Sequence, residues 1–155
     1  MSLELDAADF AILRLFQGDG DTPLQELADV CGLSVPTVQR RLRRLRDAGA
    51  IAGKVGVLGP EALGFAMTFV VMVELERERI DQLDAFRRRA MREPHVQQCY
   101  YITGDADFAL ICVARDLAEF EALTQRLFFA DDNVRRFRTS VVLSRTKTGQ
   151  TLPIS

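Results

Sequence analysis

The stretch that decides the fold of the N-terminal third reads Thr22-Pro-Leu-Gln-Glu-Leu-Ala-Asp-Val-Cys-Gly-Leu-Ser-Val-Pro-Thr-Val-Gln-Arg-Arg-Leu-Arg-Arg-Leu-Arg-Asp-Ala-Gly-Ala-Ile51. Its apolar residues recur at helical spacing on both sides of Gly32, which predicts two short helices joined by a tight turn. The second helix carries five arginines in the seven positions from Arg40 to Arg46. Such a helix fits the major groove of DNA and neutralises phosphates there, so the pattern predicts a helix-turn-helix.

Composition bounds the class of protein. With 155 residues, of which 48% are apolar and 27% charged, the chain can bury a real core in one or two domains. No apolar run approaches the roughly 20 residues of a membrane span, and the acidic start is no secretory signal. Cys31, Cys99 and Cys112 form no Cys-x-x-Cys pair, which favours buried free thiols in a reducing compartment. We therefore expect a cytoplasmic protein without a membrane partner.

The formal net charge of −2 hides an uneven distribution of bases. Residues 1–60 hold 8 acids and 7 bases, and five of those bases lie on the arginine-rich helix. A phosphate backbone senses local charge density rather than the charge of the whole chain. The overall charge therefore does not argue against DNA binding.

Capping residues predict three helices before residue 50. Asp6 is expected to cap the first of them. Thr22 is expected to cap the second, with Gln25 three residues on completing a capping box. Ser34 is expected to cap the third, and Gly49 to end it.

After residue 50 the hydrophobic pattern changes. Residues 51–58 read as a short strand or hairpin arm, which Gly59-Pro60 breaks. We then expect strands at 65–75, 96–102, 107–114 and 134–144 and helices at 79–92 and 117–128. That order is a ferredoxin-like β-α-β-β-α-β unit. The expected fold class is α+β: a winged-helix-like helix-turn-helix domain at 1–50, a linker strand at 51–64 and the β-α-β-β-α-β domain at 65–155.

Two of the expected strands are apolar on both faces. Phe69, Val71 and Val73 share one face of the first strand, yet Val70 and Met72 on the other face are also apolar. Both helices of a β-α-β-β-α-β unit pack on one side of the sheet, so the other side needs a different cover. The simplest cover is the same sheet of a second copy in a two-fold dimer. The alternative is that the N-terminal helices fold back over the sheet.

The third helix divides into a packing face and an exposed arc. Val38, Leu42 and Leu45 lie at i, i+4 and i+7 and form the packing face. The opposite arc is the expected DNA-binding surface. The alternative reading is a solvated basic face whose arginines pair with Asp29 and Asp47.

Positions along the arc predict different contacts. The start of a recognition helix meets base edges, whereas later residues lean towards phosphates. Gln39 and Arg40 are the best specificity candidates, because Gln and Arg can pair bidentately with adenine and guanine. The candidate DNA-binding residues are Ser34, Pro36, Thr37, Gln39, Arg40, Arg43, Arg44 and Arg46.

The turn Thr103-Gly-Asp-Ala-Asp-Phe108 is the second concentrated signal. Gly104 permits a tight turn whose backbone N–H groups could bind a carboxylate, and Asp105 or Asp107 could meet an ammonium group. That combination would suit an α-amino acid. From these residues alone, a plain Gly-Asp hairpin turn with solvated acids is favoured. A Mg²⁺ site would need more oxygen ligands than are evident.

Catalytic and metal-binding arrangements are hard to assemble from this chain. The only histidine, His95, follows Pro94 before an expected strand and reads as a surface or loop residue. No Ser-His-Asp or Cys-His set can be built without it, and there is no Gly-rich phosphate loop. We therefore expect no enzymatic activity, no cofactor and no metal.

Two sets of short motifs lie along the chain in a fixed order. The N-terminal set is Leu5-Asp6, Ile12-Leu13-Arg14-Leu15, Leu27-Ala28, Gly32-Leu33-Ser34, Val38-x-Arg40-Arg41-Leu42-x-Arg44-Leu45 and Gly49-x-Ile51. The C-terminal set is Pro94-x-Val96, Cys99-Tyr100, Thr103-Gly104-Asp105-x-Asp107-Phe108 and Leu152-Pro153-Ile154. With these residues the chain resembles, nearly end to end, the Lrp/AsnC family of leucine- and asparagine-responsive transcriptional regulators, also called feast/famine regulators. One departure is Arg46-Asp47, where the family commonly has Glu, and it alters one surface charge.

The resemblance implies a division of labour between the two domains. It implies DNA binding by 1–50, and effector sensing and oligomerisation by 65–155. It further implies dimers formed through the sheets, octamers of four dimers, and a small amino-acid effector bound between dimers. The implied effector-binding residues are Thr103, Gly104, Asp105, Ala106 and Asp107.

Two other functions remain open at this point. The first is an enzyme on the same scaffold, as in the siroheme decarboxylases that resemble this family, although a single histidine is few for a tetrapyrrole cavity. The second is a free-standing effector sensor without DNA binding, which would leave the arginine-rich helix without a purpose.

Overall fold

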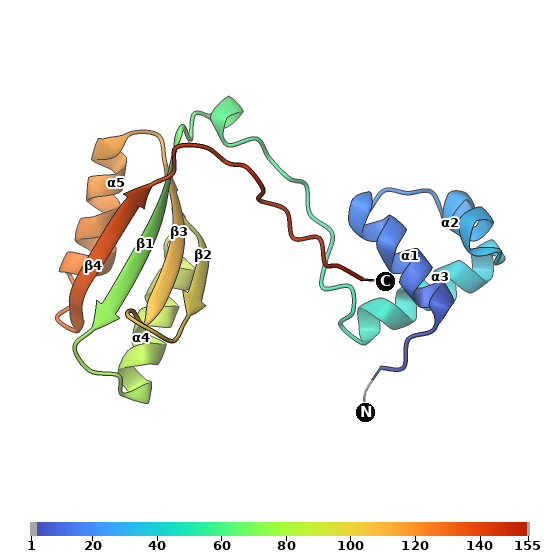
Figure 1. The fold of residues 1–155 in the computed structure, drawn as a ribbon, viewed down its shortest axis with the longest axis horizontal. Helices are drawn as coiled ribbons and strands as arrows, with labels where there is room; N and C mark the ends of the chain where they lie inside the picture. Colours follow the sequence, from blue (N-terminus) through green and yellow to red (C-terminus); the bar gives the residue numbers. More distant parts are fainter. Residues whose placement is uncertain (1–2, 155) are drawn as a thin grey trace. The chain divides into compact units, whose positions relative to one another are not determined.

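The computed structural model describes residues 3–154 and divides the chain into two compact units (Figure 1). The helical unit holds the chain up to Val57 and again from Lys147, and the sheet unit is Leu58–Thr146. The chain therefore passes between the units twice. The expected C-terminal domain ran to residue 155, whereas the tail from Lys147 lies with the helical unit.

Three helices build the helical unit, as the capping residues predicted. They are α1 (Ala7–Gly18), α2 (Leu24–Cys31) and α3 (Val35–Asp47). Asp6 caps α1 through a reciprocal box, in which its Oδ1 accepts from Asp9 N at 2.9 Å and Asp9 Oδ2 accepts from Asp6 N at 3.1 Å. Gly32, with φ 62°, supplies the left-handed residue that ends α2.

The capping box predicted at Thr22 is wrong. The Thr22 hydroxyl donates to the Asp19 carbonyl at 2.6 Å, and the Gln25 amide donates to Asp29 at 2.8 Å. The reason is that Pro23 occupies the cap position, and its carbonyl accepts the first helical hydrogen bond from Leu27 N at 3.1 Å.

Ser34 stands at the cap of α3 as predicted, but its hydroxyl pairs with the Thr37 hydroxyl at 2.8 Å rather than with a backbone N–H. The N-terminal end of α3 thus keeps unpaired N–H groups of the kind that can bind anions.

The core of the helical unit lies between the three helices. Val38, Leu42 and Leu45 of α3 are buried against Ile12 of α1 and Leu27 of α2. This confirms the predicted packing face of the third helix. The C-terminal tail also attaches here, because the Gln17 side chain accepts from Leu152 N at 3.0 Å and donates to Leu152 O at 3.1 Å.

The linker forms no strand within the single chain. Residues 52–59 have no regular secondary structure, and the short helix η1 (Glu61–Leu63) follows them. The side chains of Val55 and Val57 are exposed. An extended segment needs a partner for its backbone groups, and the chain offers it no paired neighbour, so the predicted strand at 51–58 is absent from this structure.

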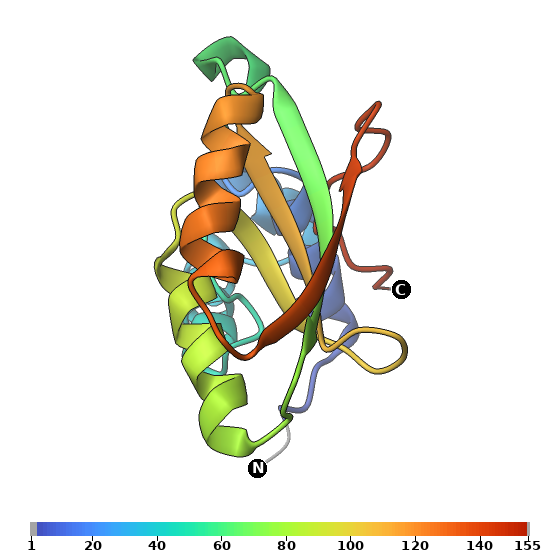
Figure 2. The same ribbon diagram turned by 90° about the vertical axis from the view of Figure 1, so that its left-hand side faces the viewer.

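The sheet unit has the predicted β-α-β-β-α-β order. Its elements are β1 (Met67–Leu75), α4 (Ile80–Arg92), β2 (Val96–Tyr101), β3 (Phe108–Ala114), α5 (Leu117–Thr124) with the π-helix η2 (Gln125–Phe129), and β4 (Val134–Val141). The strands lie in the order β2-β3-β1-β4, and all neighbours are antiparallel. Figure 2 shows α4 and α5 together on one face of the sheet.

Aromatic rings fill the space between the sheet and its two helices. Phe69 of β1 stacks on Phe120 of α5 with ring centroids 3.7 Å apart, and Phe108 of β3 meets Phe86 of α4 at 4.7 Å. The buried face of β1 continues through Val71. These contacts fix both helices on the sheet, because alternate strand residues point to the same face.

The opposite face of the sheet is apolar at its centre. Val70 pairs with Ile111 and Met72 with Ala109 across β1 and β3, and all four are only partly buried. Within residues 58–146 both helices lie on the other side. The two-sided apolar character predicted for the central strands is thus present, and we call this surface the open face.

Removing a ring from the aromatic core should strongly lower the stability of the sheet unit. We expect Phe69→Ala to lower the free energy of unfolding by about 3–5 kcal/mol, because it removes a fully buried ring and leaves a cavity. Phe129→Ala is the matched control, since 63% of that residue is exposed, and should cost about 1 kcal/mol. Urea unfolding of both variants measures this. Equal losses would contradict the assigned core.

Candidate functional sites

The exposed side of α3 carries the residues that the sequence assigns to DNA. Seven of the eight candidates are exposed, and the eighth, Thr37, is partly buried. The exposed ones are Ser34, Pro36, Gln39, Arg40, Arg43, Arg44 and Arg46. The structure therefore gathers the set on one helix and its cap, opposite the packing face.

Two arginines of α3 are engaged by acids of α1. Arg41 Nη1 donates to Asp9 Oδ1 at 2.9 Å and to Asp6 Oδ2 at 2.8 Å, and Arg44 Nη2 donates to Asp9 Oδ2. The Asp9 side chain is fully buried. Burial raises the pKa of this carboxyl, but hydrogen bonds from Asp6 N, Arg41 and Arg44 outweigh burial and hold the pKa below its ordinary value.

These acidic partners are not the ones the sequence suggested. The alternative reading paired the arginines with Asp29 and Asp47, whereas the ion pairs formed involve Asp6 and Asp9. The sequence did indicate that Asp9 needs a partner. Asp9 stands three residues before Ile12 and so lies on the buried stripe of its helix. A charged residue at such a position needs a partner of opposite charge.

The remaining arginines of α3 are free of ion pairs. Within residues 3–154, Arg40 and Arg43 pair with no acid. Arg46 lies over the Phe16 ring at 5.7 Å from its centroid, a cation–π contact that keeps its charge available. The positive charge of α3 that is not engaged in an ion pair thus resides in these three side chains.

The Gly104 turn is built partly by the acid assigned to the effector. Gly104 has φ 111°, a conformation that favours glycine. Asp107 N donates to Val73 O at 2.9 Å, and Asp107 Oδ2 accepts from Leu75 N at 2.6 Å. Asp107 therefore ties the turn to the end of β1, and one of its oxygens is already used.

The other candidate effector-binding residues at this turn differ in their exposure to solvent. Thr103, Gly104 and Asp105 are exposed, whereas Ala106 is buried. Asp105 is therefore the acid of this turn that remains available to an ammonium group.

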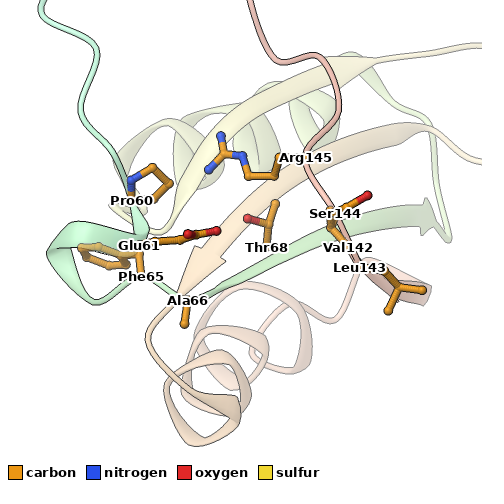
Figure 3. A pocket seen from close by; sticks show the side chains of 9 residues that line it. All are labelled: Pro60, Glu61, Phe65, Ala66, Thr68, Val142, Leu143, Ser144 and Arg145. Atoms are coloured by element: carbon orange, nitrogen blue, oxygen red, sulfur yellow. The ribbon is translucent and has the colours of Figure 1, made fainter.

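Two hollows lie elsewhere in the sheet unit. The smaller has a volume of about 70 Å³ and lies between η1, the start of β1 and residues 142–145 (Figure 3). Sites for small molecules usually measure about 300–1,000 Å³, so it is too small for an effector. The larger is a groove of about 550 Å³ lined by Phe128, Phe129, Asp131, Asp132, Val134, Arg135, Arg136 and Phe137.

This larger groove, the Phe129 groove, was not anticipated from sequence. It combines aromatic rings, carboxylates and guanidinium groups along η2 and β4. Asp131, Asp132 and Asn133 form the turn that follows η2, in which Asp131 Oδ1 accepts from Asn133 N at 2.9 Å. In the sequence, the adjacent Phe128-Phe129 pair is the feature that could have indicated an aromatic groove here.

His95 lies in the loop before β2, as predicted, but it is not a solitary surface residue. Its Nδ1 is 3.0 Å from Glu93 Oε1, and its Nε2 is 3.2 Å from Glu119 Oε1. Burial raises the pKa of Glu93, while hydrogen bonds from Arg126 and His95 lower it to below its ordinary value. The network joins the end of α4 to α5.

Other chemistry is sparse in the described part of the chain. Residues 3–154 contain no cluster of three His, Cys, Asp or Glu side chains able to hold a metal ion. No helix in the same range is both long and apolar enough to cross a bilayer. The three cysteines are free thiols, and burial raises the pKa of Cys112 to about 12.

Comparison with protein families supports the assignment of a DNA-binding helical unit and of a ligand-binding sheet unit. The family model of a winged helix-turn-helix DNA-binding domain matches residues 5–52. The model of the Lrp/AsnC ligand binding domain matches residues 68–152. The first covers the helices that present the arginines, and the second covers the sheet unit with the Gly104 turn and the Phe129 groove.

Relatives and solved structures agree along almost the whole chain. An uncharacterised helix-turn-helix transcriptional regulator of Sinorhizobium fredii is 43% identical over 99% of this chain and 90% of its own. The leucine-responsive regulatory protein of Rhizobium meliloti is 37% identical over 94% and 93%. A Neisseria meningitidis regulator, solved in complex with L-methionine, superimposes with a TM-score of 0.90 at 27% identity, covering 97% of both chains.

These relatives carry the names of transcriptional regulators, which opposes the decarboxylase alternative, and the matched DNA-binding domain opposes a free-standing sensor. The chain therefore belongs to the Lrp/AsnC family of DNA-binding transcriptional regulators, with a helix-turn-helix unit and a ligand-binding domain.

Proposed function

We propose that this protein is a homo-oligomeric regulator whose assembly or operator affinity responds to a small amino acid. The observation that carries the proposal is the exposed basic arc of α3 on a chain that also contains the family's ligand-binding domain. The L-methionine complex of the Neisseria regulator supports an amino acid as the class of effector. We place its action in the cytoplasm, because a DNA-binding regulator needs access to chromosomal DNA.

The DNA-binding surface divides between base reading and phosphate binding. Ser34, Pro36, Thr37, Gln39 and Arg40 occupy the cap and first turns of α3, the part of a recognition helix that approaches base edges. Arg43 and Arg46 lie further along and keep free charge for phosphates. Arg44 was assigned to phosphates from the sequence, but its pairing with Asp9 gives it a different environment.

Two substitutions separate these roles. Arg40→Ala should weaken operator binding by about 1–3 kcal/mol and relax base preference, because a bidentate contact to a base is lost. Arg43→Ala should weaken binding to all sequences alike and reduce the salt slope by about 1. Genomic footprinting supplies the operator, and fluorescence anisotropy with operator and scrambled duplexes measures both effects. Two variants that bind like the parent would show that α3 is not the recognition helix.

Assembly is proposed to begin at the open face of the sheet. Its centre, formed by Val70, Met72, Ala109 and Ile111, needs an apolar cover that the sheet unit does not supply. A second copy meets that need through a two-fold contact of the same surface. Further association into an octamer of four dimers follows the family resemblance.

A charge at the centre of the open face tests the dimer. Ile111→Glu in the full chain should shift the protein from dimers or larger assemblies to monomers, because a carboxylate would be buried without a partner. Met91→Glu places the same charge on the exposed side of α4 and should leave assembly unchanged. Analytical ultracentrifugation distinguishes the two. A variant at Ile111 that assembles like the parent would place the contact elsewhere.

The effector is proposed to bind beside Thr103, Gly104, Asp105, Ala106 and Asp107, at a contact between dimers. Exposed backbone N–H groups of the turn suit a carboxylate, and the free Asp105 suits an ammonium group. A ligand at such a contact shifts assembly only by binding one arrangement more tightly, and a tenfold shift needs about 1.4 kcal/mol per site.

Asp105→Ala should abolish the effect of the amino acid on assembly and leave ligand-free DNA binding largely intact, since the turn belongs to the other unit. Calorimetry across the amino acids and sedimentation of parent and variant measure this. Asp132→Ala, in the Phe129 groove, is the comparison variant. Loss of binding in the Asp132 variant alone would move the site to that groove.

A further inference from the structure

The five arginines of α3 fall into two groups that the sequence does not distinguish. Arg41 and Arg44 form ion pairs with Asp6 or Asp9 at the start of α1, whereas Arg40, Arg43 and Arg46 form none within residues 3–154. The acid that both paired arginines share is Asp9. This acid therefore decides which positive charges of the helix remain available.

Asp9 is well placed for that role, because both of its oxygens are occupied. Oδ1 accepts from Arg41 Nη1 at 2.9 Å, and Oδ2 accepts from Asp6 N at 3.1 Å and from Arg44 Nη2. None of its side chain is exposed. A buried carboxylate is strongly destabilising unless it is paired, so these contacts are held tightly.

The charge balance of the cluster is neutral. Asp6 and Asp9 contribute two negative charges, and Arg41 and Arg44 contribute two positive charges. Binding to the DNA backbone depends on cations that displace counterions from phosphates. Arginines neutralised by a buried acid contribute little to that displacement.

We propose that Asp9 is a positioning residue for DNA recognition: it withholds Arg41 and Arg44 from phosphates and fixes α3 on α1, so that Arg40, Arg43 and Arg46 face DNA as free charges. The consequence is that the protein binds its operator more selectively relative to DNA of other sequences. Sequence-independent binding is electrostatic, so withholding two charges lowers it without removing a base-reading residue.

Arg44 is the group through which this role can be measured. About 47% of its side chain is exposed, against 23% for Arg41. If Asp9 loses its charge, the Arg44 guanidinium should therefore reach a phosphate more readily than the Arg41 guanidinium does. Arg43, one residue before it and exposed, is the matched control.

The experiment measures the salt dependence of binding of the full chain to a 30-base-pair duplex of random sequence, by fluorescence anisotropy. We expect Arg43→Gln to reduce the slope of log K against log salt by about 1 per recognition helix. Arg44→Gln should leave the slope unchanged. Asp9→Asn should steepen it by about 1, and the Asp9→Asn, Arg44→Gln double variant should return to the parental slope.

The outcomes separate this proposal from a purely structural role of Asp9. A structural role would lower the unfolding temperature of Asp9→Asn without changing its slope, and that result would overturn the proposal. A slope reduced as much by Arg44→Gln as by Arg43→Gln would also overturn it. If Asp9→Asn fails to fold, as judged by circular dichroism, the comparison of Arg44→Gln with Arg43→Gln decides alone.

The proposal rests on α3 being the DNA-contacting helix, and the same data test that premise separately. An unchanged slope for Arg43→Gln together with Arg40→Gln would remove α3 from DNA and overturn both proposals. A reduced slope for both, with a reduced slope for Arg44→Gln as well, would leave α3 in place and overturn only the role of Asp9.

Discussion

A four-stranded antiparallel sheet that carries both of its helices on one face must find a cover for the other. In this chain the uncovered centre is made of Val70, Met72, Ala109 and Ile111, and none of them has a polar group to offer water. A second copy of the same sheet is the cover that needs no additional partner, and two-fold symmetry follows from self-contact. The proposed dimer would bring two α3 helices into one particle, which suits an operator with two related half-sites.

Charge in the helical unit follows a different constraint, because arginines on a short helix repel one another and attract any phosphate. Five arginines within seven residues would bind DNA of every sequence if all were free. Placing Asp9 in the contact between α1 and α3 allows two of the five to serve packing. The burial of that carboxylate in turn requires both arginines, so helix packing and the surface charge depend on the same contact.

Much of the fold could be predicted from the sequence because local patterns agree with the tertiary structure. The alternation from Met67 to Leu75 and the helical stripe Val38, Leu42 and Leu45 each correspond to a buried face. The signals that failed concern single hydrogen bonds: Thr22 has the composition of a cap, but Pro23 takes its place. Choices of that kind depend on a shift of one residue, which hydrophobic periodicity does not resolve.

The exposed arc of α3 was predictable from the sequence, whereas the ion-pair partners of its arginines were not. Sequence position indicated that Arg40, Arg43 and Arg44 share a surface, and the structure adds that Arg44 alone of these three pairs with an acid. That acid lies 35 residues away in the sequence, so no local rule could pair them. The Phe129 groove was missed for a similar reason, since its walls come from η2 and β4, which only the folded sheet brings together.

In the proposed regulator, the effect of a ligand on DNA binding would pass along each chain through the two connections between the units, at residues 57–58 and 146–147. The second connection leads from β4 into a tail that is held on α1 by two hydrogen bonds between Gln17 and Leu152. A typical intramolecular hydrogen bond contributes only about 0.5–1.5 kcal/mol net to stability. The coupling free energy between two ligand-binding sites is usually about 1–3 kcal/mol, which is similar to the contribution of these two hydrogen bonds together. A ligand that favours one arrangement of the sheets therefore needs no large conformational energy to alter how the tail is held. In the proposed regulator, a modest preference of the ligand for one arrangement would therefore be enough in energetic terms to change how α3 is presented.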